Sequence, residues 1–308
     1  SFDMIKATYS KRTLFFKLPA GTSRGILTEK DVFYLTLFES ENPTKKGIGE
    51  IATIPGLSID AVPELEQKIK SLVHKINSGD KIEADEFMGF PALEFAYETA
   101  LLGINSLSPV LLFPSEFTEG TKGVPINGLI WMGTKEFMIK QVEEKLAAGF
   151  KCLKLKIGSI DFQAELEIIR SIRERYPVDK LEIRVDANGA FTPENVLPVL
   201  EQLATFNIHS IEQPIKAGQF EAMKKLCVES PLPIVLDEEL IGITSRQKKE
   251  ELLDIIQPQY IILKPSLIGG IRASEEWIFL AGEQRIGWWV TSALESNIGL
   301  NAIAQWVA

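Results

Sequence analysis

The chain has 308 residues, 45% hydrophobic and 24% charged, with a formal net charge of −9. This is the composition of an ordinary globular protein, and a net negative charge without a basic block argues against nucleic-acid binding. No apolar run approaches the about 18 residues of a membrane span, and the start lacks the hydrophobic stretch of a signal peptide. Two cysteines are too few for a disulfide framework or a zinc site, so we expect a cytoplasmic protein.

The first region, residues 1–120, predicts a small α+β capping domain. The expected elements are β-rich stretches at 4–18 and 31–40, a polar hairpin-like turn at 41–47, and helices at 62–76 and 90–104. The second helix opens with Pro91, which suits a helix start. A Pro-containing linker at 111–125 precedes a change of rhythm.

The second region, residues 121–308, alternates short β-rich runs with amphipathic helices. Strands are expected at 126–132, 152–157, 181–187, 208–213, 233–238, 260–264 and 287–292. Helices are expected near 134–148, 160–176, 193–206, 217–229, 244–253 and 270–285. This alternation predicts parallel strands joined by helical crossovers, and hence an α/β fold with a TIM-type β/α barrel. No eighth strand is visible, so we expect the last strand to be missing from the given sequence.

Three acidic residues each follow a short apolar run, one strand–helix unit apart. Glu212 follows Asp186 by 26 residues, and Asp237 follows Glu212 by 25. In a barrel, equivalent points at the carboxyl ends of the strands converge on one mouth. Three converging carboxylates repel one another unless a hard cation lies among them, and oxygen-only ligation suits Mg²⁺. The spacing therefore predicts a metal site.

Lysines extend the same spacing on both sides of the carboxylates. Lys156 precedes Asp186 by 30 residues, and Lys264 follows Asp237 by 27. Lys154 points to the same side of its strand as Lys156, because side chains alternate along a strand. An ammonium near a metal ion and other lysines loses part of its proton affinity, so these lysines suit proton transfer.

Each of these residues also has a simpler explanation. A strand-end acid such as Asp186 is often a helix cap, and Lys154 with Lys156 would suit the solvated face of an edge strand. Lys264 precedes a proline, as a surface-turn lysine does. The common register and the apolar surroundings favour the site. Glu238 and Glu239 are open to two interpretations, as an extension of the metal site or as supporting and capping residues.

With the motifs K-x-K, D-x-N, E-Q-P, D-E and K-P-S-L-I-G-G at these positions, the chain resembles the enolase superfamily, and more narrowly its muconate-lactonizing-enzyme subgroup. Within this subgroup it is most similar to the o-succinylbenzoate synthases, dehydratases of menaquinone biosynthesis. The resemblance covers nearly the whole chain. It implies one Mg²⁺ ion, with Mn²⁺ as an alternative, and a small-molecule carboxylate substrate, and it leaves the oligomeric state open.

The resemblance also assigns roles to residues. It implies that Lys156 is the general base, that Lys154 tunes it electrostatically, and that Lys264 holds the substrate and its anionic intermediate. The implied metal ligands are Asp186, Glu212 and Asp237. The implied substrate contacts are Arg184, Asn188, Ser292, Glu295 and a capping loop with Thr22, Ser23 and Arg24.

The implied reaction converts the menaquinone precursor SHCHC to o-succinylbenzoate by α-proton abstraction and syn elimination of water. In this subgroup the same catalytic set also serves muconate cycloisomerisation, N-acylamino acid racemisation and dipeptide epimerisation, and the core residues do not separate these activities. Arg184, the K-P-S-L-I-G-G motif and the early T-S-R-G segment favour the synthase. A non-catalytic barrel would be expected to have lost a core residue, and a metal-dependent aldolase would not explain the first domain.

Overall fold

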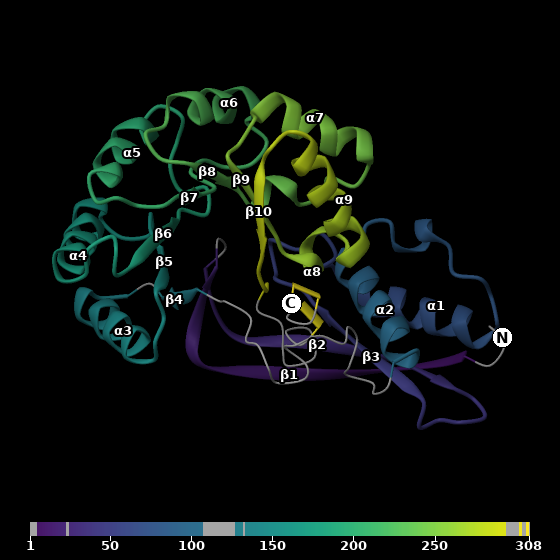
Figure 1. Cartoon of the computed structure of the whole chain (residues 1–308). Helices are drawn as coiled ribbons and strands as arrows, with labels where there is room; N and C mark the ends of the chain where they lie inside the picture. Colours follow the sequence, from purple (N-terminus) through teal and green to yellow (C-terminus); the bar gives the residue numbers. More distant parts are fainter. Residues whose placement is uncertain are drawn as a thin grey trace.

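The computed structural model describes residues 5–22, 25–106, 127–131, 133–293, 302–303 and 306–307, with the backbone alone at 16–22 and 25–28. These residues form a three-stranded antiparallel sheet and a seven-stranded parallel sheet (Figure 1). The expected domain boundary at 120/121 lies outside the described residues and stays a prediction.

The antiparallel sheet consists of β1 (Ile5–Thr22), β2 (Gly25–Glu39) and β3 (Lys46–Ala52), in that order. The predicted polar turn joins β2 to β3, and their register pairs Phe38 with Lys46 and Val32 with Ala52. Both predicted β-rich stretches are therefore strands of one sheet.

Helices α1 (Leu65–Asn77) and α2 (Pro91–Ile104) pack on the antiparallel sheet, as the predicted amphipathic pattern requires (Figure 1). Leu35 of β2, Leu72 of α1 and Leu93 of α2 lie in their common core and are fully buried. Gly49 of β3 lies directly against the backbone of Ala96, where a Cβ atom would collide. The glycine therefore lets α2 approach the sheet closely.

The parallel sheet has the strand order β10-β9-β8-β7-β6-β5-β4. Its strands are β4 (Gly128–Ile130), β5 (Cys152–Lys156), β6 (Glu182–Asp186), β7 (Ile211–Glu212), β8 (Ile234–Leu236), β9 (Tyr260–Leu263) and β10 (Gly287–Val290). The helices are α3 (Lys135–Ala147), α4 (Phe162–Arg175), α5 (Val196–Ala204), α6 (Phe220–Glu229), α7 (Arg246–Ile256), α8 (Pro265–Ile268) and α9 (Gly270–Glu283). The sheet curls with the helices outside it (Figure 1). The seven predicted strands are confirmed.

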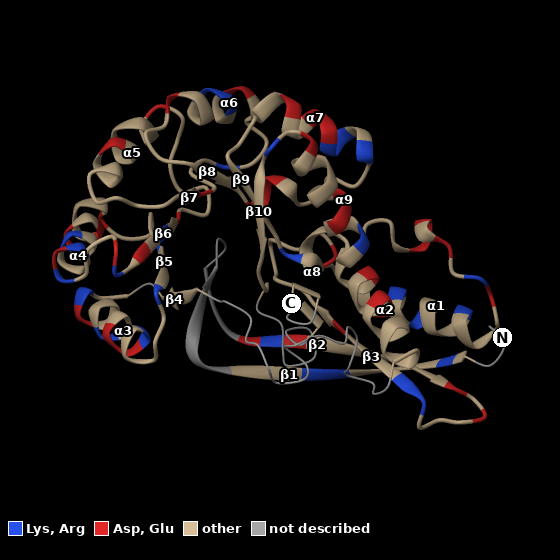
Figure 2. Ribbon diagram, viewed as in Figure 1, with Lys and Arg blue, Asp and Glu red and all other residues tan. Residues whose placement is uncertain are grey.

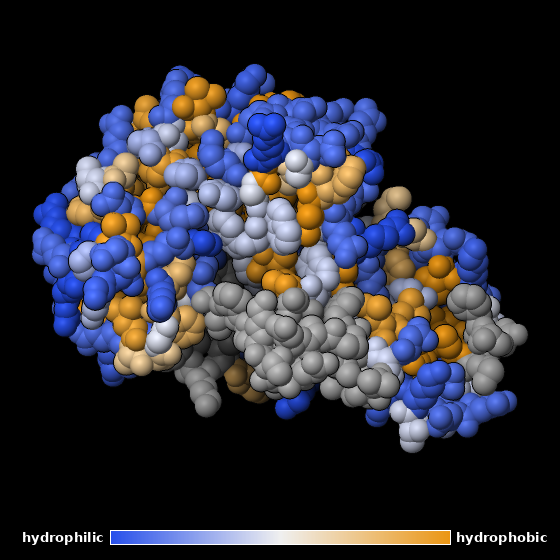
Figure 3. Space-filling view, in the orientation of Figure 1, coloured by the Kyte–Doolittle hydropathy of each residue, from blue (hydrophilic) through white to orange (hydrophobic). Residues whose placement is uncertain are grey.

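The outer helices separate the core from solvent. Charged residues lie along α3 to α7 (Figure 2), and hydrophilic side chains cover most of this face (Figure 3). On the inner side of these helices, Ile183 and Val185 of β6 and Leu200 of α5 are fully buried. Every helix in the described part of the chain is too short or too polar to cross a bilayer.

Helix α2 also contacts the helices that follow β9. It packs against α8 and α9. The carboxylate of Glu98 in α2 accepts hydrogen bonds from the backbone N–H groups of Ile271 (2.8 Å) and Arg272 (3.0 Å) at the start of α9. Because these N–H groups have no partner within the helix, the carboxylate caps α9 from another part of the fold.

Candidate metal and active site

Three acidic side chains meet at the carboxyl edge of the parallel sheet. Asp186 ends β6, Glu212 ends β7 and Asp237 directly follows β8. The parallel register pairs Asp186 with Glu212 and Glu212 with Val235, so the strand ends are level. One ligand oxygen from each acid lies within 4.8 Å of the others, and all three side chains are buried. The predicted convergence is confirmed, and this all-oxygen donor set fits a hard divalent cation.

Two lysines of β5 reach the first two carboxylates. Lys156 Nζ lies 3.2 Å from Asp186 Oδ2. Lys154 Nζ lies 3.2 Å from Glu212 Oε2 and 3.7 Å from Asp186 Oδ2. The predicted alternation along the strand therefore places both ammonium groups in the carboxylate cluster, and they are not on a solvated face.

Lys264 reaches the cluster from its other end. It follows β9, and its ammonium donates a 2.7 Å hydrogen bond to Asp237 Oδ2. The side chain is largely buried, which is unlike a surface-turn lysine. Lys264 thus brings a third ammonium group to the three carboxylates at the end of the sheet.

The pKa values of Asp186 and Glu212 shift in opposite directions, because burial and the nearby lysines act against each other to different extents. Burial opposes the ionisation of Asp186, but Lys156 and Lys154 outweigh it, so the pKa of Asp186 lies below its ordinary value. For Glu212, burial outweighs the attraction of Lys154 and raises the pKa to about 7. Glu212 Oε2 receives no hydrogen bond from any described residue, although Lys154 lies nearby. A bound cation would supply the missing partner, so the donor set fits a metal ion.

Asn188 links Lys156 of β5 to Glu238, in the segment after β8. Its Oδ1 accepts a 3.1 Å hydrogen bond from Lys156, and its Nδ2 donates a 2.9 Å hydrogen bond to Glu238 Oε1. Its backbone has φ +45°, and its N–H bonds Asp186 Oδ1 at 3.0 Å. Glu238, whose pKa burial raises to about 8, therefore lies beside the carboxylate cluster and bonds Asn188.

Gln213 supports the metal-site loop, a role that the sequence interpretation missed. Its Oε1 accepts hydrogen bonds from the backbone N–H groups of Asp237 (3.1 Å) and Glu239 (3.2 Å). Its Nε2 donates to Ile215 O (2.9 Å) and Glu239 Oε1 (3.2 Å). The side chain is fully buried and ties the end of β7 to the end of β8. Its place directly after Glu212 in the E-Q-P motif was the available signal.

Arg184 lies two residues before Asp186 on β6, so its side chain is on the same face of the strand as that carboxylate. Its Nε donates a 2.9 Å hydrogen bond to Glu182 Oε2, and its guanidinium lies 4.4 Å from the ring centre of Trp289. Glu182 begins β6, and Trp289 belongs to β10 at one end of the strand order. The predicted substrate contact therefore stays a prediction, and Arg184 has two protein partners in this structure.

The remaining predicted substrate contacts are only partly described. Ser292 follows β10 and is half-buried, and its carbonyl accepts a 3.1 Å hydrogen bond from Thr291. Thr22 ends β1, where only the backbone is described. Ser23, Arg24 and Glu295 lie outside the described residues.

The fold and this carboxylate–lysine site define a class of β/α-barrel enzymes that use a divalent metal ion and carry an antiparallel capping sheet. Residues 138–308 match the family described as "Enolase C-terminal domain-like". An o-succinylbenzoate synthase from Desulfotalea psychrophila is 45% identical over 99% of this chain and 90% of its own length. The chain belongs to the enolase superfamily.

Two further similarities place the chain within this superfamily. The crystal structure of MenC from Desulfotalea psychrophila LSv54 superposes with a TM-score of 0.87 and 41% identity, and the match covers 99% of this chain and 90% of that one. An L-Ala-D/L-Glu epimerase from Bacillus subtilis is 28% identical over 58% of this chain and 48% of its own length. The similarity to the synthase is thus both greater and more extensive.

Proposed function

We propose that this enzyme catalyses the o-succinylbenzoate synthase reaction, the dehydration of SHCHC in menaquinone biosynthesis. The observation that carries this proposal is the 45% identity to a synthase along nearly the whole chain, which the epimerase similarity does not match in extent. The buried cluster of three lysines and three carboxylates supplies the groups that α-proton abstraction requires.

In the proposed reaction, Mg²⁺, with Mn²⁺ as an alternative, is held by Asp186, Glu212 and Asp237. A bound divalent ion supplies electrostatic stabilisation of the negative charge that develops at the substrate carboxylate. Lys156 takes the proton α to this carboxylate and then returns it to the departing β-hydroxyl, which leaves as water. Lys264, at the other end of the cluster, holds the anionic substrate. Formation of the aromatic ring drives the elimination.

The test is turnover of SHCHC by the full chain, followed as o-succinylbenzoate formation with Mg²⁺ and after chelation. We expect metal-dependent turnover that Lys156→Ala lowers by a factor of about 10²–10⁴, the usual contribution of a general base. The exposed Lys151→Ala is the matched control. Absence of turnover by the metal-loaded, folded protein would reject the proposal.

A second candidate is N-acylamino acid racemisation or dipeptide epimerisation. It is supported by the placement of Lys156 and Lys264 at opposite ends of the carboxylate cluster, because racemisation needs a base and an acid on two faces of the substrate. Exchange of solvent deuterium into N-acylamino acids or dipeptides, lost in Lys264→Ala as well as in Lys156→Ala, would favour this activity over dehydration.

A further inference from the structure

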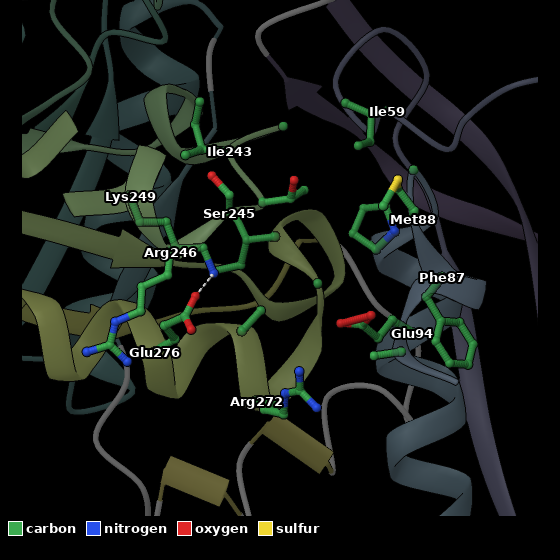
Figure 4. Close-up of a pocket in the computed structure, with 18 of the residues that line it drawn as sticks. Ile59, Phe87, Met88, Glu94, Ile243, Ser245, Arg246, Lys249, Arg272 and Glu276 are labelled. Carbon is green, nitrogen blue, oxygen red and sulfur yellow. Dashed lines mark hydrogen bonds and ion pairs between the residues drawn. The ribbon is translucent and has the colours of Figure 1, made fainter. Parts of the chain in front are cut away.

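A cavity of about 450 Å³ lies between α2 and the helices α7, α8 and α9 (Figure 4). We call it the α2–α9 cavity. None of the carboxylates or lysines of the candidate active site lines it. Its size lies within the range of about 300–1,000 Å³ that is typical of small-molecule sites, and such sites often lie between packed units of a fold.

Two side chains of opposite charge face this cavity without protein partners. Glu94 comes from α2 and Arg272 from α9 (Figure 4). Among the described residues, neither the Glu94 carboxylate nor the Arg272 guanidinium makes a hydrogen bond or an ion pair, and the two do not pair with each other. Burial raises the pKa of Glu94 to about 7 against the opposing charges of Arg272 and Lys249. Both groups are thus open to a ligand.

The cavity wall carries four further charged groups, Asp85, Arg246, Lys249 and Glu276. Lys249 is buried and pairs with Glu276 at 2.9 Å, and Arg246 lies over the ring of Phe279 at 5.2 Å (Figure 4). A ligand between Glu94 and Arg272 would meet one anionic and one cationic group that have no partner among the described residues.

Apolar side chains line the cavity as well, beside the hydroxyl-bearing Thr244 and Ser245. Ile59 and Met88 contribute from the first region, and Ile243 and Leu267 contribute from the barrel. Ile59 and Met88 are 38% and 75% exposed. An aliphatic group bound here would cover them.

We propose that the α2–α9 cavity binds an aliphatic α-amino acid as its zwitterion. Glu94 accepts hydrogen bonds from the ammonium, Arg272 donates to the carboxylate, and the side chain packs on Ile59, Met88 and Ile243. Because α2 and α9 each provide one of the two charges, the bound molecule bridges the antiparallel sheet's helices to the barrel and stabilises the folded protein by mass action.

The test is calorimetric titration of the Mg²⁺-loaded full chain with L-leucine, isopentylamine and 4-methylpentanoate. L-Leucine carries both charged groups, and the other two probes carry one each. We expect saturable binding of L-leucine and affinities at least about tenfold weaker for both single-charge probes, since each loses a charge-assisted hydrogen bond. No saturable binding of L-leucine, or equal binding of a single-charge probe, would overturn the proposal.

Variants locate the binding. Glu94→Gln and Arg272→Gln should each weaken L-leucine binding about tenfold or more, whereas the exposed Glu250→Gln on α7 should bind as wild type. Lys156→Ala should also bind as wild type, because the active site is separate. Binding that survives both cavity variants, or that is lost in Lys156→Ala, would place the ligand elsewhere and overturn the proposal. Thermal unfolding of each variant without ligand shows whether it is folded. If only one of the two cavity variants folds, that variant alone is enough to locate the binding.

Discussion

Asn188 accepts a 3.1 Å hydrogen bond from the ammonium of Lys156 while its own amide donates to Glu238 at 2.9 Å. The flexible lysine is thereby held at the end of β5 by a residue that is itself fixed in the loop after β6. We interpret Asn188 as a positioning residue for the proposed base, since it acts on the orientation of Lys156.

Asn188→Gly should lower kcat by about 10–100-fold with little change in KM, as loss of a supporting hydrogen bond near a metal centre does. Glycine accepts the left-handed backbone at φ +45°, so the change removes the side chain without backbone strain. The matched control is Asn207→Gly, at an exposed residue with φ +52°. Steady-state kinetics at saturating metal measure both. An unchanged kcat would show that Lys156 needs no such support.

Lys154 competes with a cation for two of the three carboxylates. Its ammonium lies 3.2 Å from Glu212 Oε2 and 3.7 Å from Asp186 Oδ2. Lys154→Met should therefore tighten Mn²⁺ binding by about tenfold or more, because a positive charge next to the ion is removed, while turnover falls. Electron paramagnetic resonance of free Mn²⁺ measures the affinity, with the exposed Lys151→Met as control. Weaker Mn²⁺ binding in the variant would contradict this electrostatic account.

The hydrogen bonds of Gln213 should contribute to the free energy of unfolding, separately from any effect on catalysis. Gln213→Leu should lower the free energy of unfolding by about 2–5 kcal/mol, because it leaves the buried N–H groups of Asp237 and Glu239 without their acceptor. Urea denaturation with a chelator present measures this without a contribution from metal binding. Gln202→Leu, on the exposed face of α5, should change the unfolding free energy little. Equal effects of the two substitutions would argue against the proposed support.

The positions of the site residues could be predicted from the regular spacing of strands and helices in the sequence. Strands and helices alternate at nearly constant length, so Asp186, Glu212 and Asp237 fall at equivalent strand ends, and the two-residue alternation of β5 directs Lys154 and Lys156 to one side. The hydrogen bonds of Gln213 were not predictable in this way, because they depend on how the loops after β7 and β8 meet. Periodicity describes the faces of elements and gives no information about contacts between loops.

The contact between α2 and α9 is a second feature beyond local patterns. Glu98 and Ile271 lie 173 residues apart, and α2 has apolar residues on most sides, so no polar stripe marked Glu98 as a cap. Such a pairing is set by the packing of the antiparallel sheet's helices on the barrel.

The titration of Glu98 should make the free energy of unfolding depend on pH. Burial raises its pKa to about 7, and this outweighs the hydrogen bonds from Arg272 and Ile271 that favour the charged form. The folded state therefore holds the proton more tightly than the unfolded state, where the pKa is near 4.5. The stability linked to this proton is present below pH 4.5 and is lost as the pH rises to about 7, and it is on the order of 3 kcal/mol.

Glu98→Gln should reduce this dependence. Relative to the variant, the wild-type free energy of unfolding should fall between pH 4.5 and 7 and then level off, because glutamine carries no titrating proton. Urea denaturation at a series of pH values measures the difference. Glu283→Gln, at an exposed residue of α9, should follow the wild-type curve. A wild-type stability that instead rises relative to Glu98→Gln across this range would mean that the helix N-terminus stabilises the charged carboxylate more than burial opposes it.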